Sequence, residues 1–368
     1  MIERFHGIDR HKQYSTVSVK NREGKEIAFI ARCENLTAYI ETLGPCDAVV
    51  IEASTGSFYW ADLIELRGGV CYVLNPFKFK IIRESWNKCD KQDCRNMSTA
   101  LWVYLVTDEF GLPTVHKPEA AVRELRKLFA QYQLLTCQAT QLKNNLQAIL
   151  CDNGVTLSAE KKKRLLDERY ASETLGRLQM SVASRLSIEI ALSILWKVAE
   201  QKKKLRDAII AAGAPFEDSV KILITIRGIT AFLALAFLAD IGDVQRFKTL
   251  RKMNAYLGLV QKAKQSGDKN LPRGINRQSR KLTRTLLTQS VPHITAASPE
   301  LRRYYAELRA RRGVGRARIA VIRKICGVMR RMLLEGTEFR DKDPANFERK
   351  LKEYEAVMRR IQTEPKSA

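Results

Sequence analysis

The sequence predicts an α/β N-terminal domain, then long coiled-coil helices, then an all-α basic C-terminal domain. Three observations predict this order. Short β-rich runs alternate with helical patterns over the first hundred residues, a heptad repeat follows, and lysine and arginine are concentrated in the last third. The 368 residues suffice for two or three domains of about 100 to 200 residues. The expected boundaries are 1–112 for the α/β domain, 113–215 for a coiled-coil arm, 216–335 for the basic helical domain and 336–368 for a helical tail.

The N-terminal domain begins with three predicted strands. Runs rich in β-branched and aromatic residues lie at Arg4–Ile8, Tyr14–Val19 and Glu26–Ala31. Polar, turn-prone stretches separate them. Closely spaced strands of this kind are typical of an antiparallel meander.

Helices and buried strands alternate in the rest of this domain. A helical pattern at Leu36–Leu43 leads into Ala48–Ile51, which is apolar on both faces and is therefore expected to be a central strand. A second helical pattern, Phe58–Leu66, leads into another apolar run, Val70–Leu74. A meander followed by alternating helices and parallel strands is the order of a ribonuclease H-like sheet.

Two long helices are expected after Pro118, separated by the helix-breaking sequence Asp152-Asn153-Gly154. Each should carry an apolar stripe. An intramolecular hairpin of the two helices, or pairing of helices between chains, would bury these stripes. The first stripe is a heptad repeat of Leu125, Leu128, Tyr132, Leu135, Ala139, Leu142, Leu146 and Ile149, and the second comprises Val182, Leu186, Ile190, Ile194 and Val198.

The positive charge of the chain is regional. The net charge is +24, yet residues 1–110 hold 14 basic and 15 acidic side chains. Gln245–Leu286 holds twelve basic residues and one acid, and Leu301–Arg331 holds eleven and one. Such densities indicate a polyphosphate partner, because cations that neutralise phosphates release condensed counterions. A solvated basic face is the alternative, and an anionic membrane surface is a weaker one.

Several classes of protein are excluded or disfavoured. No run approaches the roughly 18 apolar residues of a membrane span, and the charged start argues against a signal peptide. Eight cysteines without a CxxC pair suit reduced thiols and disfavour structural zinc, and the four histidines do not cluster in sequence. We therefore expect a cytoplasmic protein.

Four acids of the N-terminal domain are candidate metal ligands. Asp9 follows the first predicted strand and Glu52 follows the central one, so the two lie close together if these strands are neighbours. Asp90 and Asp93 are three residues apart and share a face on a helix. Carboxylates suit Mg²⁺, and two ions about 4 Å apart could hold both reacting oxygens of a phosphodiester. Ordinary caps or turn residues are the alternative.

The basic domain holds two further candidates. Gly228, in Leu223–Ile229, resembles the glycine of a helix-hairpin-helix turn, which would let backbone N–H groups approach a phosphate. Ser266 lies in the expected polar loop Lys262–Gly267, where cations could hold a scissile phosphate. A short helix connection and a simple Ser-Gly turn are the respective alternatives. A basic helix should follow Gly274–Lys281.

Several short pieces together resemble one family. The chain is similar to the DEDD transposases of the insertion-sequence "one-ten" family, which are bridge-RNA-guided recombinases with a RuvC-like N-terminal domain and a serine-bearing C-terminal domain. The pieces occur in the right order and cover both ends of the chain. They are Gly7-Ile8-Asp9, Val50-Ile51-Glu52-Ala53-Ser54-Thr55-Gly56, Val73-Leu74-Asn75-Pro76, Lys88-Cys89-Asp90-Lys91-Gln92-Asp93, Ile226-Arg227-Gly228-Ile229, Tyr256-Leu257-Gly258-Leu259 and Ser266-Gly267.

The resemblance implies a mechanism, partners and a nucleoid-associated place in a prokaryotic cytoplasm. Asp9, Glu52, Asp90 and Asp93 would hold Mg²⁺, two ions in number, with Mn²⁺ as a substitute, and Ser266 would form a transient phosphoserine link to DNA. It also implies donor and target DNA, a structured guide RNA, and a homo-oligomer, dimer to tetramer, in which the acids of one subunit meet the serine of another. The residues expected to contact nucleic acid are Gly228, Arg251, Lys252, Lys262, Lys264, Arg273, Arg277, Arg280 and Lys281.

The chain departs from the family pattern in places. Cys89 stands where threonine is usual, Val260-Gln261 replaces the proline after Gly-Leu, and Gln278-Ser279 occupies the place of a common Gly-Asn. These changes make Ser279 a second candidate for the nucleophile. Two other functions stay open: a RuvC-like nuclease or junction resolvase that uses water as nucleophile, and a degenerate element protein that only binds nucleic acid.

Overall fold

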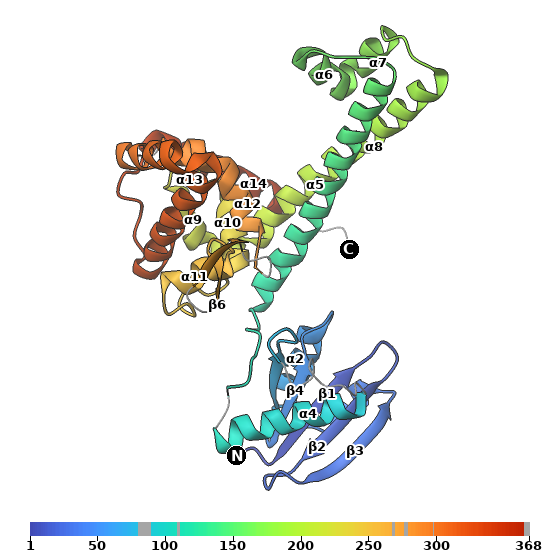
Figure 1. Ribbon diagram of the computed structural model, residues 1–368, viewed down its shortest axis with the longest axis vertical. Helices are drawn as coiled ribbons and strands as arrows, with labels where there is room; N and C mark the ends of the chain where they lie inside the picture. Colours follow the sequence, from blue (N-terminus) through green and yellow to red (C-terminus); the bar gives the residue numbers. More distant parts are fainter. Residues whose placement is uncertain (80–89, 109–110, 267–268, 276–278, 297, 364–368) are drawn as a thin grey trace. The chain divides into compact units, whose positions relative to one another are not determined.

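The chain folds into two compact units, Met1–Lys117 and Pro118–Ala368 (Figure 1). The division of the second unit into an arm, a basic domain and a tail stays a prediction. The computed structural model describes residues 1–79, 90–108, 111–266, 269–275, 279–296 and 298–363, and within 261–275 and 361–363 it describes the backbone alone.

The first unit is built on a five-stranded mixed sheet with the strand order β3-β2-β1-β4-β5. The first three strands are antiparallel, β4 is parallel to β1, and β5 is parallel to β4. The predicted order of elements is confirmed. The strands are β1 (Arg4–Arg10), β2 (Ser15–Lys20), β3 (Glu26–Cys33), β4 (Asp47–Glu52) and β5 (Val70–Leu74).

Helices cover both faces of this sheet. On one face, α1 (Leu36–Glu41) and α2 (Ser57–Leu66) pack on side chains that include Ile8 and Val49. On the other, α4 (Asp90–Trp102) crosses β1 and β2 (Figure 1) and continues into a π-helical turn at Val103–Thr107. Because successive side chains of a strand point to opposite faces, the two cores take alternate residues of β1 and β4.

The second unit begins with a long antiparallel helix pair, α5 (Ala120–Asp152) and α8 (Val182–Ala212), with α6 (Ala159–Leu166) and α7 (Glu168–Gly176) at its far end (Figure 1). The two long helices pack along each other within one chain. The predicted stripe of α5 lies on the packed side, where Leu125 and Leu146 are buried.

The predicted stripe of α8 is wrong for this packing. Val182, Leu186, Ile190 and Ile194 are exposed, with 86% to 47% of their surface accessible, and of the predicted five only Val198 is buried. The buried face of α8 instead comprises Ile188, Ala191, Leu192 and Leu195. The error has a physical reason: α8 carries apolar residues on two faces, and spacing alone cannot say which of them meets α5.

The core of the basic part surrounds α10 (Ala231–Ile241), all of whose residues are buried. A helix that is apolar all round must be covered on every side. The covering helices are α9 (Glu217–Ile224), α11 (Leu250–Tyr256), α12 (Leu282–Thr295), α13 (Pro299–Glu335, kinked at Gly313) and α14 (Pro344–Thr363). A short 3₁₀ turn, Ala214–Phe216, links α8 to α9.

The C-terminal helix α14 is tied into this core. Tyr354 is 2% exposed, and the buried ammonium of Lys350 donates hydrogen bonds to the backbone carbonyls of Ile224, of Ile226 at 2.8 Å and of Ile229 at 3.1 Å. These carbonyls end α9 and form the turn that contains Gly228. Lys350 therefore caps the turn from inside the core.

The predicted loop around Ser266 is instead a strand. β6 (Gln261–Ser266) pairs antiparallel with β7 (Lys269–Ile275), and Ser266 lies opposite Lys269. Two residues of sequence, Gly-Asp, separate the paired ends, which is a signal for a tight hairpin. The polar character of the segment hid this, because both strands are too hydrophilic to show an apolar alternation. The basic helix expected after Lys281 is α12.

No helix among the described residues combines the length and the apolar character that crossing a bilayer requires.

Candidate metal centre and nucleic-acid surface

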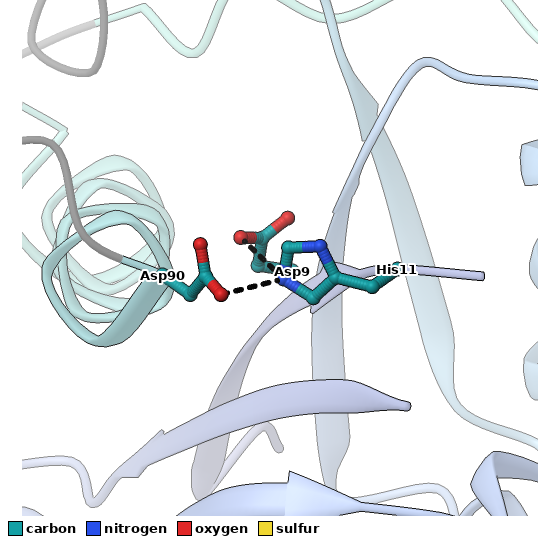
Figure 2. Close-up of side chains that lie close together, drawn as sticks. All are labelled: Asp9, His11 and Asp90. Carbon is teal, nitrogen blue, oxygen red and sulfur yellow. Dashed lines mark ion pairs between the residues drawn. The ribbon is translucent and has the colours of Figure 1, made fainter. Parts of the chain in front are cut away.

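Two carboxylates and an imidazole converge at one end of the sheet in the first unit. Asp9 lies near the end of β1, His11 follows this strand directly, and Asp90 begins α4. The Nε2 atom of His11 lies 3.3 Å from Oδ2 of Asp9 and 3.2 Å from Oδ2 of Asp90 (Figure 2). One ligand atom from each of the three side chains lies within 4.8 Å of the others.

A glycine brings α4 close enough to form this cluster. Gly7 faces α4, and a Cβ atom at this position would lie 2.2 Å from the carbonyl oxygen of Cys94 and 2.5 Å from the amide nitrogen of Ser98. Only glycine lets the helix lie directly on β1. Asp9 is two residues further along the same face, and Asp90 is one turn before Cys94, so the close approach places these two carboxylates together.

The other two predicted acids lie next to this cluster. Ile8 pairs with Ile51 in the parallel ladder of β1 and β4, so the next positions along the two strands are Asp9 and Glu52. Glu52 shares its face of the sheet with Val50, which packs on the α4 side. Asp93 lies one turn after Asp90. Among the described residues, neither Glu52 nor Asp93 belongs to the group whose ligand atoms lie within 4.8 Å of one another.

The electrostatics of Asp9 reflect crowding of negative charge. Burial of its side chain raises the pKa, and the charges of Asp90 and Asp93 raise it further, while His11 opposes the shift. Tyr14 restrains Asp90, the exposed acid of the cluster, because its hydroxyl donates a hydrogen bond of 3.1 Å to Oδ2 of Asp90. The Tyr14 ring also lies 4.8 Å, between centroids, from the His11 ring.

The candidate nucleophiles lie in the second unit. Ser266 is the last residue of β6, and its side chain lies outside the described part of the structure. Ser279 stands where the chain returns from the hairpin and packs against Gly258, because a Cβ atom on Gly258 would lie 2.2 Å from the Ser279 Oγ. The backbone N–H of Arg280 donates to the carbonyl of Tyr256 at 3.1 Å. The two ends of the hairpin are thus joined at its base.

The predicted nucleic-acid contacts divide into three groups. Arg251 and Lys252 on α11, and Arg280 and Lys281 before α12, are exposed in the second unit. Gly228 adopts a left-handed conformation and packs on α12, since a Cβ atom there would lie 2.9 Å from the Ile294 nitrogen. The side chains of Lys262, Lys264, Arg273 and Arg277 lie outside the described part.

Comparison with known proteins assigns both regions to one family. Residues 6–152 match the model of the DEDD transposases of IS110, and residues 220–306 match that of the transposase IS116/IS110/IS902 family. The chain is 23% identical over 299 residues to the transposase for insertion sequence element IS1111A of Coxiella burnetii, covering 79% of each chain. It is 22% identical over 295 residues to a probable family 20 transposase of Pseudomonas aeruginosa, covering 78% of this chain and 79% of the other.

The chain belongs to the IS110 family of DEDD transposases. It is therefore a DNA transposase, an enzyme that acts on DNA, and the DEDD family implies dependence on a divalent metal. The first family match contains the acids of the first unit, and the second contains the hairpin of Ser266.

The acid cluster of this transposase fits a divalent cation. Carboxylate oxygens are the ligands that Mg²⁺ and Mn²⁺ prefer. The like charges that raise the pKa of Asp9 would be balanced by a cation at this point. Asp9 and Asp90, with oxygens already within reach of each other, are the residues of the described part that would hold it.

His11 is the member of the site that sequence reasoning missed. The four histidines of the chain are dispersed in the sequence, and this spacing hides any cluster. One local signal could have found it: Asp9 and His11 are two residues apart at the end of a predicted strand, and this spacing places two side chains on the same face. The structure shows that Asp90 then joins them from α4.

Proposed function

We propose that the transposase cuts and rejoins DNA with a metal-bearing acid site, Asp9, Glu52, Asp90 and Asp93, and the hydroxyl of Ser266. The observation that carries the proposal is the convergence of Asp9 and Asp90, far apart in sequence, at the sheet end where Glu52 is next in register. The strand order of the first unit supports a RuvC-like, ribonuclease H-like assignment of this domain.

The proposed chemistry is a pair of transesterifications. The Ser266 hydroxyl loses its proton as its Oγ attacks the phosphorus and forms a serine phosphodiester, while one P–O bond to deoxyribose breaks and the released sugar oxygen takes up a proton in exchange. Attack by a sugar hydroxyl on this link then restores a DNA phosphodiester and the serine. Divalent ions, Mg²⁺ in our proposal, would stabilise charge on the phosphate oxygens. The four acids hold the ions, and His11 and Tyr14 orient Asp90.

A guide RNA and a homo-oligomer complete the proposal. The basic character of the second unit supports binding of more than one nucleic acid, because α13 carries a second run of cations in addition to the run that flanks the hairpin in sequence. The exposed stripe Val182, Leu186, Ile190 and Ile194 of α8 supports pairing between chains. In the assembly we propose, the acids of one subunit act with Ser266 of another.

Trapping of the covalent link tests the nucleophile. Ser266→Ala should abolish protein–DNA adducts on denaturing gels while DNA binding persists, and the matched variant Ser279→Ala should still form them. Adducts that survive in Ser266→Ala and disappear in Ser279→Ala would transfer the role to Ser279. RNA that co-purifies with the transposase and is required for strand exchange would support the guide.

A nuclease or junction resolvase that uses water is the alternative function. The acid cluster favours it as much as it favours recombination, since such an enzyme needs the same carboxylates. It would keep cutting DNA with Ser266→Ala and stop with Asp9→Asn, whereas the recombinase loses cleavage with either substitution.

A further inference from the structure

Three guanidinium groups surround Tyr256 at the base of the β6–β7 hairpin. Arg126 of α5 approaches the Tyr256 hydroxyl to 3.5 Å, and Arg280, just before α12, makes a hydrogen bond to it. The guanidinium carbon of Arg246 lies 4.4 Å from the centroid of the Tyr256 ring and 4.0 Å from that of Phe247. The cluster thus joins residues from four separate segments of the second unit.

Other contacts hold these arginines in place. The Arg126 Nε donates to the carbonyl of Ala239 at 2.7 Å and its Nη2 to that of Asp240 at 3.0 Å, at the end of α10. The Arg246 Nε donates to the carbonyl of Ile241 at 2.8 Å. Arginines fixed by neutral carbonyls and ring faces keep their positive charge and lose much of their freedom. The positions of Arg126 and Arg246 are therefore set before any ligand binds.

One donor of this cluster is left without an acceptor. The Nη2 atom of Arg246 is buried and has no hydrogen-bond partner among the described residues. A buried guanidinium N–H that makes no hydrogen bond is costly, and native proteins rarely keep one without a use for it. An acceptor from outside the chain would satisfy it.

The charge of the cluster is also unbalanced. The acid that interacts with Arg126 and Arg280 is Asp240, and its Oδ2 already accepts hydrogen bonds from the backbone N–H of Thr283 at 2.9 Å and from its hydroxyl at 2.8 Å. Burial lowers the pKa of Arg126, and repulsion from Arg280 and Arg246 lowers it further. Arg126 and Arg280 thus face a carboxylate whose Oδ2 already accepts two hydrogen bonds, and together with Arg246 this group of cations favours an anionic ligand.

We propose that Arg126, Arg246, Arg280 and the hydroxyl of Tyr256 form a binding site for one phosphate of the DNA backbone. Guanidinium groups match the geometry of phosphate oxygens, and a phenol hydroxyl can donate to a third oxygen. The phosphate held here is not the one at Ser266 of the same hairpin, because β6 rises about 17 Å from its first to its last residue at about 3.3 Å per residue. The site positions the duplex relative to the hairpin.

This inference rests on DNA as the partner and not on the role of Ser266. Binding is therefore measured with the full-length transposase in a Ser266→Ala background and with EDTA in place of a divalent cation, so that neither serine-dependent nor water-dependent cleavage can interfere. The probe is a short fluorescein-labelled DNA duplex of arbitrary sequence, titrated at several KCl concentrations. A failure of the serine mechanism would leave these measurements unchanged.

Arg246→Ala should weaken binding by about tenfold or more, since hydrogen bonds to charged groups are involved, and should lower the salt slope by about one. Arg246→Lys should restore the slope and only part of the affinity. Tyr256→Phe, which removes one hydroxyl, should cost about threefold. The control Arg177→Ala removes an equally charged side chain that is 76% exposed and paired with Glu173, and should change nothing.

Three results would overturn the site. The first is unchanged affinity and slope in Arg246→Ala when thermal melting shows that the variant is folded. The second is a loss confined to an RNA hairpin probe of matching length, which would assign the cluster to RNA. The third is a covalent DNA adduct of the Ser266→Ala protein that disappears in Tyr256→Phe, which would make Tyr256 a nucleophile instead of a binding group.

Discussion

The two units of the transposase present the same electrostatic situation with opposite signs. In the first, burial and the charges of Asp90 and Asp93 raise the pKa of Asp9. In the second, burial and the charge of Arg280 lower the pKa of Arg126. Each unit holds like charges close together, which costs folding free energy unless a counterion is gained. The first unit is suited to a cation and the second to a phosphate.

The difference teaches how a protein of net charge +24 can keep an acidic site. The acids lie within residues 1–110, where 14 basic and 15 acidic side chains nearly balance each other. The excess of basic residues belongs to the other unit. DNA is repelled by an acid cluster unless metal fills it, and it is attracted by the second unit at any metal concentration. Metal and DNA binding should therefore be separable by substitution.

The largest effect should come from removing one acid. Asp9→Asn keeps the size of the side chain and removes its charge, so we expect cleavage and strand exchange to fall by about a thousandfold or more. DNA affinity at low metal concentration should not change, since that affinity resides in the second unit. Parallel cleavage and anisotropy assays measure the two effects. A variant that loses DNA binding and cleavage to the same extent would break the separation.

A smaller effect should come from moving the acids without removing them. In Gly7→Ala the new methyl group collides with the backbone of α4, which must shift and carry Asp90 away from Asp9. We expect a loss of stability of about 1 to 3 kcal/mol and of activity of about a hundredfold. The control Gly44→Ala meets no atom within 4 Å and should be neutral. Equal behaviour of the two variants in urea unfolding would contradict the packing argument.

Substitutions in the exposed stripe of α8 test whether this helix pairs between chains. Leu186→Glu combined with Ile190→Glu places charges where the stripe is exposed, so the monomer should fold normally, while pairing of chains should weaken by about tenfold or more. Sedimentation at several protein concentrations measures this. As a control, Ala199→Glu adds charge at an exposed position of the same helix that lies off the face of the stripe. An unchanged oligomer in the double variant would assign the pairing to another surface.

The smallest effect on transposition should come from substituting Asp47. This residue begins β4, at the end of the strand opposite to Glu52. Burial opposes ionisation there, but hydrogen bonds from His6, Arg4 and the Gly44 N–H hold the pKa of Asp47 well below its usual range. Its contribution to stability should be full above the unfolded pKa of about 3.9 and should be lost as the pH falls below it. Asp47→Asn should flatten the dependence of the melting temperature on pH below about pH 4, where the wild-type carboxylate takes up its proton. An equally steep dependence in this variant would place the acid sensitivity elsewhere.

The sequence allowed most of the fold of the first unit to be predicted. Strands such as Val70–Leu74 are marked by apolar runs between turn residues, and period-two alternation then fixes which side chains face α4. The region around Ser266 could not be predicted in this way, because a hairpin of polar residues gives no apolar alternation. The face of α8 was mistaken because two of its faces are apolar.

For the candidate sites, the sequence indicated individual residues better than it indicated the residues that contact them. Asp9 and Asp90 were predicted from strand and helix ends, but His11 and Tyr14 join them only through the packing of α4 on β1. Arg126 and Arg246 belong to segments more than a hundred residues apart, and no local pattern connects them to Tyr256. Such contacts follow from tertiary packing, which spacing does not encode.

A mixing experiment tests the central claim most directly. A tagged Asp9→Asn transposase, which keeps its serine, is combined with an untagged Ser266→Ala transposase, which keeps its acids, and DNA is added with Mg²⁺. If the acids of one subunit act with the serine of another, the tagged protein should form the covalent DNA adduct only in the mixture. No adduct in the mixture, with the wild-type protein forming it under the same conditions, would contradict the account.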